Sequence, residues 1–224
     1  MKDIPLRTLW LQSEAHLALG DLIYTSLQPN IIRRQITKTC SVNGDLLQPK
    51  EFFDYFAVGG NWHQHPSNFN QDHDYLQIKD IFDYRNDFKK SPSYRSQVQK
   101  LSNAEPQKDY LGMPILTEQQ LQKTFQYYLD LLTDIEANGF DANKPSLKEN
   151  GDDAIGVALT PSFEFFHFRT GHHRLAIAQI LNLLRVPVKI HLIHLSLIGN
   201  NPIAMSNIEI QRVRNILMRV RSKE

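Results

Sequence analysis

The sequence predicts an α+β (mixed α/β) fold in which a small mixed sheet carries packed helices. Short apolar runs bounded by glycine, proline and asparagine recur along the chain, a pattern typical of strands joined by turns. Two segments, 118–138 and 206–222, instead space their apolar residues three and four apart, as an amphipathic helix does. Hydrophobic residues make up 41% of the chain and charged residues 22%, which is ordinary for a globular protein.

The first half of the chain gives the weaker secondary-structure signals. Residues 5–19 suit a short helix, residues 22–27 a strand that Gln28-Pro29-Asn30 stops, and residues 52–58 a strand or a short helix. Residues 59–114 are polar and show no sustained period. We expect one short helix there, carried by Tyr75, Ile78, Ile81 and Phe82.

The helix over 118–138 is the clearest element. Its apolar face is formed by Leu121, Phe125, Tyr128, Leu132 and Ile135. Thr117 and Gln120 have the spacing of a capping box, and Gly139 supplies the stop.

The remaining elements follow in order. Residues 140–151 form a polar loop, and residues 154–159 and 165–168 form a hairpin around the turn 160–162. A helix then runs from Gly171 to about Leu184, and residues 186–193 form a strand. Ser206 and Glu209 make a second capping box, which starts a helix whose apolar face holds Ile210, Val213, Leu217 and Val220.

The length of 224 residues fits one domain, 1–224. We expect its core over about 20–60 and 150–195, a helical insertion over about 61–140, and a basic C-terminal helix over 206–222. The net charge of +1 gives no global attraction to nucleic acid or membrane. The single cysteine, Cys40, excludes an internal disulfide and fits a reducing compartment. Without a signal peptide or an 18-residue apolar run, the expected location is the cytoplasm, away from membranes.

The most informative stretch is Phe165 to Arg174, in which an aromatic strand meets Gly171 and a helix begins at once. A helix N-terminus offers unpaired N–H groups and the positive end of its dipole. His172, His173 and Arg174 add cationic side chains to that first turn. The arrangement predicts an anion site that suits phosphate, at Thr170, Gly171, His172, His173 and Arg174. The alternative is a tight strand-to-helix turn that binds nothing.

The order of strand, Gly171-His172-His173-Arg174-Leu175, helix, and Val186-Pro187-Val188 in a strand resembles the ParB/sulfiredoxin superfamily. Bacterial and phage members pair a Gly-Gly-Asp-Trp-type turn with a downstream Asp-Gly-x-His-Arg-Leu-Ala-Ile-Ala turn. This chain has Gly59-Gly60-Asn61-Trp62 and Thr170 to Ala178 at those places. The resemblance is specific over about 154–194 and does not reach the last thirty residues.

The resemblance implies that nucleotide phosphates are held at the glycine turn, with ATP or CTP as the type of ligand and Mg²⁺ as a companion ion. His172 stands where sulfiredoxins carry their catalytic cysteine, so the chain is not expected to be a sulfiredoxin. Thr170 replaces the aspartate of the serine-kinase branch, and residues 22–36 lack the glutamate which that branch needs. His172 and His173 remain weak catalytic candidates, and no general base is assigned.

A second wall of this pocket is expected from Asn61 and Trp62, with His194 reaching the mouth of the site. A partly exposed Trp62 ring could stack on a nucleobase near Arg174; the alternative is a tryptophan that only anchors the core. Other histidines suggest a metal, but no ligand set with established spacing is present, so none is predicted. They are His63, His65, His73, His191 and His194.

The expected function is nucleotide or phosphate binding, with phosphoryl transfer or nucleotide hydrolysis as the class of reaction if the protein is an enzyme. One alternative is a nucleotide-gated regulator that contacts DNA or an acidic partner through Arg212, Arg214, Arg219 and Arg221. The other is a module that only binds proteins.

Overall fold

The computed structural model describes residues 10–33, 40–42, 45–47, 55–64, 68–109, 112–140, 154–199 and 207–222. The chain groups into two compact units, each built from separate stretches of sequence. The sheet unit comprises residues 1–69, 154–171 and 184–224, and the helical unit comprises residues 70–153 and 172–183. The sequence predicts one domain with a helical insertion. Residues 172–183, which lie inside the predicted core range 150–195, group with the helices of the insertion.

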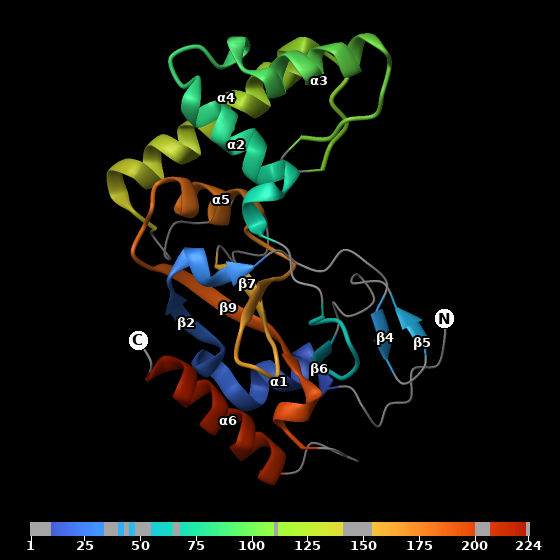
Figure 1. Cartoon of the computed structure of the whole chain (residues 1–224), viewed down its shortest axis with the longest axis vertical. Coiled ribbons are helices and arrows are strands. Elements are labelled where there is room, and N and C mark those ends of the chain that lie inside the picture. Colours follow the sequence, from blue (N-terminus) through green and yellow to red (C-terminus); the bar gives the residue numbers. More distant parts are fainter. Residues whose placement is uncertain are drawn as a thin grey trace. The chain divides into compact units, whose positions relative to one another are not determined.

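In the described part of the sheet unit, seven strands form one mixed sheet (Figure 1). The strands are β1 (Trp10–Leu11), β2 (Tyr24–Leu27), β3 (Ile32–Arg33), β6 (Tyr55–Val58), β7 (Ile155–Leu159), β8 (Phe165–His167) and β9 (Val186–His194). The expected strands over 22–27, 154–159, 165–168 and 186–193 are thereby confirmed, and residues 55–58 are a strand rather than a helix. A separate hairpin pairs β4 (Cys40–Val42) with β5 (Asp45–Leu47).

Strand β9 is the centre of the sheet. It pairs in parallel with β7 and with β6, and its first half pairs antiparallel with β2. All of its residues except Pro187 are buried, which explains the nearly continuous apolar run in its sequence. Its buried Lys189 places its ammonium 5.2 Å from the centre of the Tyr24 ring, which gives the charge a favourable contact.

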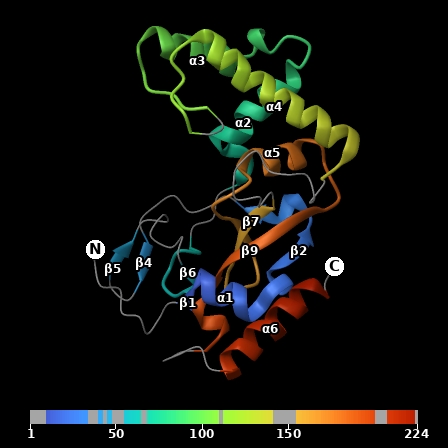
Figure 2. The same cartoon turned by 180° about the vertical axis from the view of Figure 1, so that it is seen from behind.

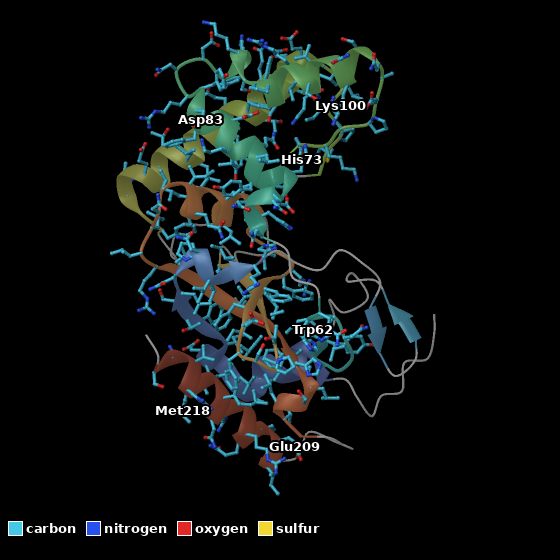
Figure 3. The ribbon with its side chains drawn as sticks, in the orientation of Figure 1. Trp62, His73, Asp83, Lys100, Glu209 and Met218 are labelled. Atoms are coloured by element: carbon cyan, nitrogen blue, oxygen red, sulfur yellow. The ribbon has the colours of Figure 1, made fainter. Side chains whose placement is uncertain are left out.

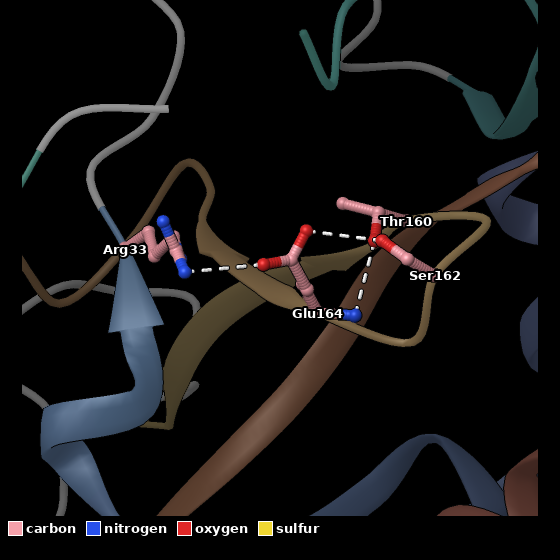
Figure 4. A network of polar contacts seen from close by, with 4 residues as sticks. All are labelled: Arg33, Thr160, Ser162 and Glu164. Atoms are coloured by element: carbon pink, nitrogen blue, oxygen red, sulfur yellow. Dashed lines mark hydrogen bonds and ion pairs between the residues drawn. The ribbon is translucent and has the colours of Figure 1, made fainter. Parts of the chain in front are cut away.

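The expected hairpin of β7 and β8 is antiparallel, with Leu159 opposite Phe165. A polar network closes its turn (Figure 4). The Thr160 hydroxyl accepts a hydrogen bond from the Glu164 backbone N–H at 3.0 Å, and the Glu164 carboxylate lies 3.2 Å from Arg33 on β3. Both charged side chains are over two-fifths exposed, so the ion pair adds little stability.

The described residues of the sheet unit include the helices α1 (Gln12–Leu19) and α6 (Asn207–Arg221). Figures 1 and 2 show α6 running beside α1. The predicted apolar face of α6 is confirmed, because Val213, Leu217 and Val220 are buried and Ile210 is half-buried. The expected cap Ser206 lies outside the described residues, as do residues 1–9 and most of the 140–151 loop.

The helical unit contains α2 (His73–Asp83), α3 (Pro92–Ser102), α4 (Glu118–Asn138) and α5 (His172–Ile180). Helix α4 has the predicted bounds, the predicted capping box of Thr117 and Gln120, and Gly139 at its end with φ +71°. Its five predicted apolar residues are all buried. The sequence predicts α2 but not α3.

Helix α5 ends at Ile180, earlier than the expected Leu184. Asn182 adopts a left-handed conformation with φ +51°, and the Leu183 N–H donates back to the Ala178 carbonyl at 3.0 Å. Such a conformation closes a helix and satisfies its last carbonyls. The expectation that the helix continues to Leu184 is therefore wrong.

Short 3₁₀ turns complete the description: η2 (Gly20–Ile23), η3 (Pro29–Ile31), η5 (Phe69–Gln71), η6 (Phe88–Lys90) and η7 (Leu195–Leu197). None of the helices in the described ranges combines the length and the apolar character needed to cross a bilayer.

Candidate functional site

The predicted strand-to-helix turn is present, and Gly171 is required by its backbone. Its φ is +85°, and a Cβ atom at this position would lie 3.0 Å from the Cα of Ile155. Side chains other than glycine rarely adopt this conformation, and the space beside Ile155 is already filled. Packing in the sheet unit alone therefore explains Gly171.

Thr170 is tied into the same unit. Its carbonyl accepts hydrogen bonds from the Gly156 N–H at 3.0 Å and from the His167 Nε2 at 2.8 Å. Its hydroxyl donates to the Ala154 carbonyl at 3.3 Å. The boundary between the units falls immediately after this turn, between Gly171 and His172.

The three cationic residues of the motif begin α5 in the helical unit. His172, His173 and Arg174 are all half-buried in its first turn. Of these, His173 lines a cavity of about 300 Å³ that lies wholly within the helical unit. The cavity is lined by residues of α2, α3, the 107–109 segment, α4 and α5: His73, Asp74, Gln77, Gln97, Lys100, Gln107, Lys108, Asp109, Thr124, Tyr128 and His173.

His173 is held between an aromatic ring and a carboxylate. Its ring centre lies 4.2 Å from that of Tyr128 on α4, with the two planes tilted by 31°. Its Nε2 lies 4.0 Å from the Asp74 Oδ1. The motif histidine and an acid from the insertion thus share one wall of the cavity.

Asp74 lies in the first turn of α2, where the Asp72 side chain caps the helix and accepts the Asp74 N–H at 3.0 Å. Burial acts to raise the pKa of Asp74. The hydrogen bond from His73 and the positive charges of the three neighbouring histidines outweigh burial and lower the pKa to about 2. Asp74 is therefore a stable carboxylate in a cationic setting.

The contact with Asp74 also changes the pKa of His73. Its Nδ1 lies 3.5 Å from the Asp74 Oδ1, and the hydrogen bond to Asp74 raises the pKa of His73. Lys100 acts to lower it, because the ammonium repels a protonated imidazole. His73 and Lys100 (both labelled in Figure 3) therefore line one cavity, and a protonated His73 carries the same charge as the Lys100 ammonium.

The expected second wall has a different role in the structure. Trp62 is only 4% exposed, and its Nε1 donates to the Val58 carbonyl at 3.1 Å. The expectation of a partly exposed indole is wrong, because the ring packs against Phe166 and His194 inside the sheet unit. Its expected proximity to Arg174 stays a prediction, since the two residues belong to different units. Asn61 is exposed, in the turn that precedes Trp62.

His194 supports the same turn. Its Nε2 donates to the Gly60 carbonyl at 2.9 Å, and its Nδ1 lies 2.7 Å from the Ser196 hydroxyl. The ring is 8% exposed, and burial lowers the pKa of His194. His63 packs edge-on against it at 4.7 Å. Over the described ranges, no three His, Cys, Asp or Glu side chains are grouped to hold a metal ion, and His65 lies outside those ranges.

Three of the four arginines considered for a DNA contact make contacts within the sheet unit. Arg212 donates to the Ile198 carbonyl at 2.9 Å, and Arg214 donates to the Ala18 carbonyl at 2.7 Å. Arg219 lies over the Phe163 ring at 5.0 Å. Arg221 is exposed at the end of α6. These contacts hold α6 against its own unit.

Sequence reasoning missed most of the cavity, because its residues lie in the stretch 59–114 that shows no sustained period. Two local signals could have revealed its helices. Asp72 is a favourable N-cap residue directly before α2. Before α3, the N-cap residue Ser91 is followed by Pro92 at the first helical position, where proline is favoured.

Comparison with protein-family models, with curated proteins and with solved structures finds no match for this chain.

Proposed function

We propose that the helical unit binds the phosphate groups of a nucleotide, or of another phosphorylated small molecule, in the cavity that His173 lines. The observation that carries this proposal is the meeting of His173 with His73, Lys100 and Lys108 around one cavity of about 300 Å³. This volume lies at the lower end of the range for small-molecule sites, about 300–1,000 Å³.

An anion would relieve the repulsion among these groups. The Lys100 ammonium repels a protonated His73. A phosphate bound between the two side chains would be attracted by both positive charges. His173 contributes to the cavity from the first turn of α5, where the helix dipole favours an anion. The carboxylates of Asp74 and Asp109 also line the cavity and favour a ligand that carries donors or a cation as well as phosphate.

The chemistry that such a site favours is phosphoryl transfer or nucleotide hydrolysis, because positioning and charge stabilisation do most of the work in those reactions. His172 and His173 remain the catalytic candidates from the motif, and Asp74 joins them as the carboxylate beside His173. Mg²⁺ is usually bound by one or two carboxylates together with substrate phosphates. Asp74 and Asp109 are the residues that would hold it.

Titration calorimetry with inorganic tripolyphosphate, ATP and CTP, with and without Mg²⁺, tests the proposal. His73→Ala, Lys100→Ala and Lys108→Ala each remove a cationic group that lines the cavity, and each should weaken binding of tripolyphosphate by about 1.5–3 kcal/mol, the usual worth of a charge-assisted hydrogen bond. Lys90→Ala is the matched control, since Lys90 belongs to the same unit but pairs with Asp87 outside the cavity. Equal affinities in all four variants would place the site elsewhere.

A further inference from the structure

Gln77 is a nearly buried polar side chain of the cavity that makes no hydrogen bond with the residues that the structure describes. It is 6% exposed, and it lines the cavity from α2. No described residue makes a hydrogen bond with its amide, and the amide oxygen and nitrogen both keep accessible surface.

Three other polar side chains of the cavity make hydrogen bonds within the protein. The Gln107 Nε2 donates to the Gln97 carbonyl at 2.9 Å, and the Asp109 Oδ1 accepts the Met113 N–H at 2.8 Å. The Thr124 hydroxyl donates to the Gln120 carbonyl at 3.1 Å. Gln77 differs from all three in that both halves of its amide are left for a ligand.

The position of Gln77 relates it to the charged end of the cavity. Gln77 follows His73 by four residues and Asp74 by three, so all three side chains lie on one face of α2. A ligand whose phosphates contact His73 and Lys100 would extend along this face towards Gln77. The amide places one donor and one acceptor side by side in a plane, and nucleobase edges carry the complementary pair.

We propose that Gln77 hydrogen-bonds the base of a bound nucleotide, so that the ligand of this cavity is a nucleotide rather than inorganic phosphate or a sugar phosphate. This inference rests on the proposed function for the phosphate end of the site. It assigns base recognition to the insertion helix α2 instead of to the glycine turn.

The test compares Gln77→Met with wild type by titration of three kinds of probe: ATP and CTP, inorganic tripolyphosphate, and the nucleosides adenosine and cytidine. Methionine has a similar volume and no amide, so the folded state should be as stable as wild type or more stable. Gln77→Leu is the second variant, should Gln77→Met fold poorly. Gln99→Met, on the exposed side of α3, is the matched control.

We expect roughly tenfold weaker binding of the preferred nucleotide in Gln77→Met, with tripolyphosphate binding unchanged. Unchanged nucleotide affinity, or an equal loss for nucleotide and tripolyphosphate, would overturn base recognition by Gln77 and leave the phosphate proposal standing. Nucleoside binding that depends on Gln77, without any tripolyphosphate binding, would overturn the phosphate proposal instead. Binding of none of the probes to wild type would overturn both.

Discussion

His173 lies against Tyr128 with ring centres 4.2 Å apart, although the two residues come from helices far apart in the sequence. The contact fixes which way the imidazole points, because a flat ring packed on another has little freedom to rotate. It leaves the Nε2 atom of His173 4.0 Å from the Asp74 carboxylate. The geometry of the proposed site therefore depends on the packing of α4 as much as on the motif itself.

Asp74→Asn should destabilise the helical unit at neutral pH. A carboxyl whose pKa falls from 3.8 to about 2 on folding stabilises the folded state above pH 3.8, and this contribution is lost as the pH falls through about 2. After allowance for solvent screening of this partly exposed group, we expect a loss of about 1 kcal/mol at pH 7. Urea unfolding followed by circular dichroism at pH 7 and near pH 2 measures it.

The control for that substitution is Asp83→Asn, which removes the acid of an exposed pair with Lys79 (Asp83 is labelled in Figure 3) and should cost under about 0.5 kcal/mol. The gap between wild type and Asp74→Asn should close at the lower pH. A gap of equal size at both pH values would show that the ionised carboxylate is not what stabilises the unit.

Gly171→Ala should cost more stability than Gly112→Ala. The two glycines have nearly the same φ, +85° and +84°, so both substitutions carry the same penalty for a left-handed backbone. Only at position 171 would the new Cβ meet protein, at 3.0 Å from the Ile155 Cα, whereas nothing lies within 4 Å at position 112. We expect about 1 kcal/mol for Gly112→Ala and roughly 2–3 kcal/mol for Gly171→Ala. Equal losses in chemical denaturation would exclude a tight contact with Ile155.

Thr117→Ala should lower the stability of the helical unit by about 1 kcal/mol. The Thr117 hydroxyl accepts the Gln120 N–H at 3.2 Å, and alanine would leave that donor of the first turn without its cap. Thr133→Ala is the matched control, because the Thr133 hydroxyl only donates to the Leu129 carbonyl within the same helix. That change should be neutral or slightly stabilising. Denaturation midpoints decide between the two, and a loss at position 133 as large as that at 117 would argue against the cap.

Trp62→Phe should affect the sheet unit and leave tripolyphosphate binding unaltered. The indole is buried, and its Nε1 hydrogen bond to the Val58 carbonyl would be lost along with part of its packing. We expect a loss of roughly 1–3 kcal/mol in the free energy of unfolding. A normal melting temperature combined with weaker nucleotide binding would restore Trp62 as a ligand contact.

The parts of the fold that the sequence predicts are those that local signals specify. Helix α4 has its cap at Thr117, its apolar stripe and its stop at Gly139 within one continuous stretch, so its bounds follow from the sequence. Helix α5 begins where predicted, but its end depends on the left-handed conformation of Asn182. Asparagine can adopt this conformation but does not require it, so the sequence does not predict where the helix ends.

The candidate site was predictable only on the motif side. His173 could be proposed from the glycine turn, but Asp74, Lys100 and Tyr128 come from three other helices, and no periodicity relates them to it. The sequence around Trp62 suits either a buried or an exposed indole. Only the structure shows that the ring is buried and that it hydrogen-bonds the Val58 carbonyl.

The helical unit is assembled from two stretches of chain, 70–153 and 172–183, with two strands of the other unit between them in sequence. During synthesis α2, α3 and α4 therefore leave the ribosome before the helix that packs against α2 and α4 exists. Until α5 arrives, those two helices keep apolar surface exposed, a state that favours aggregation or chaperone binding. His173 belongs to that last helix, so the ligand cavity is completed only when the final piece of the unit has been made.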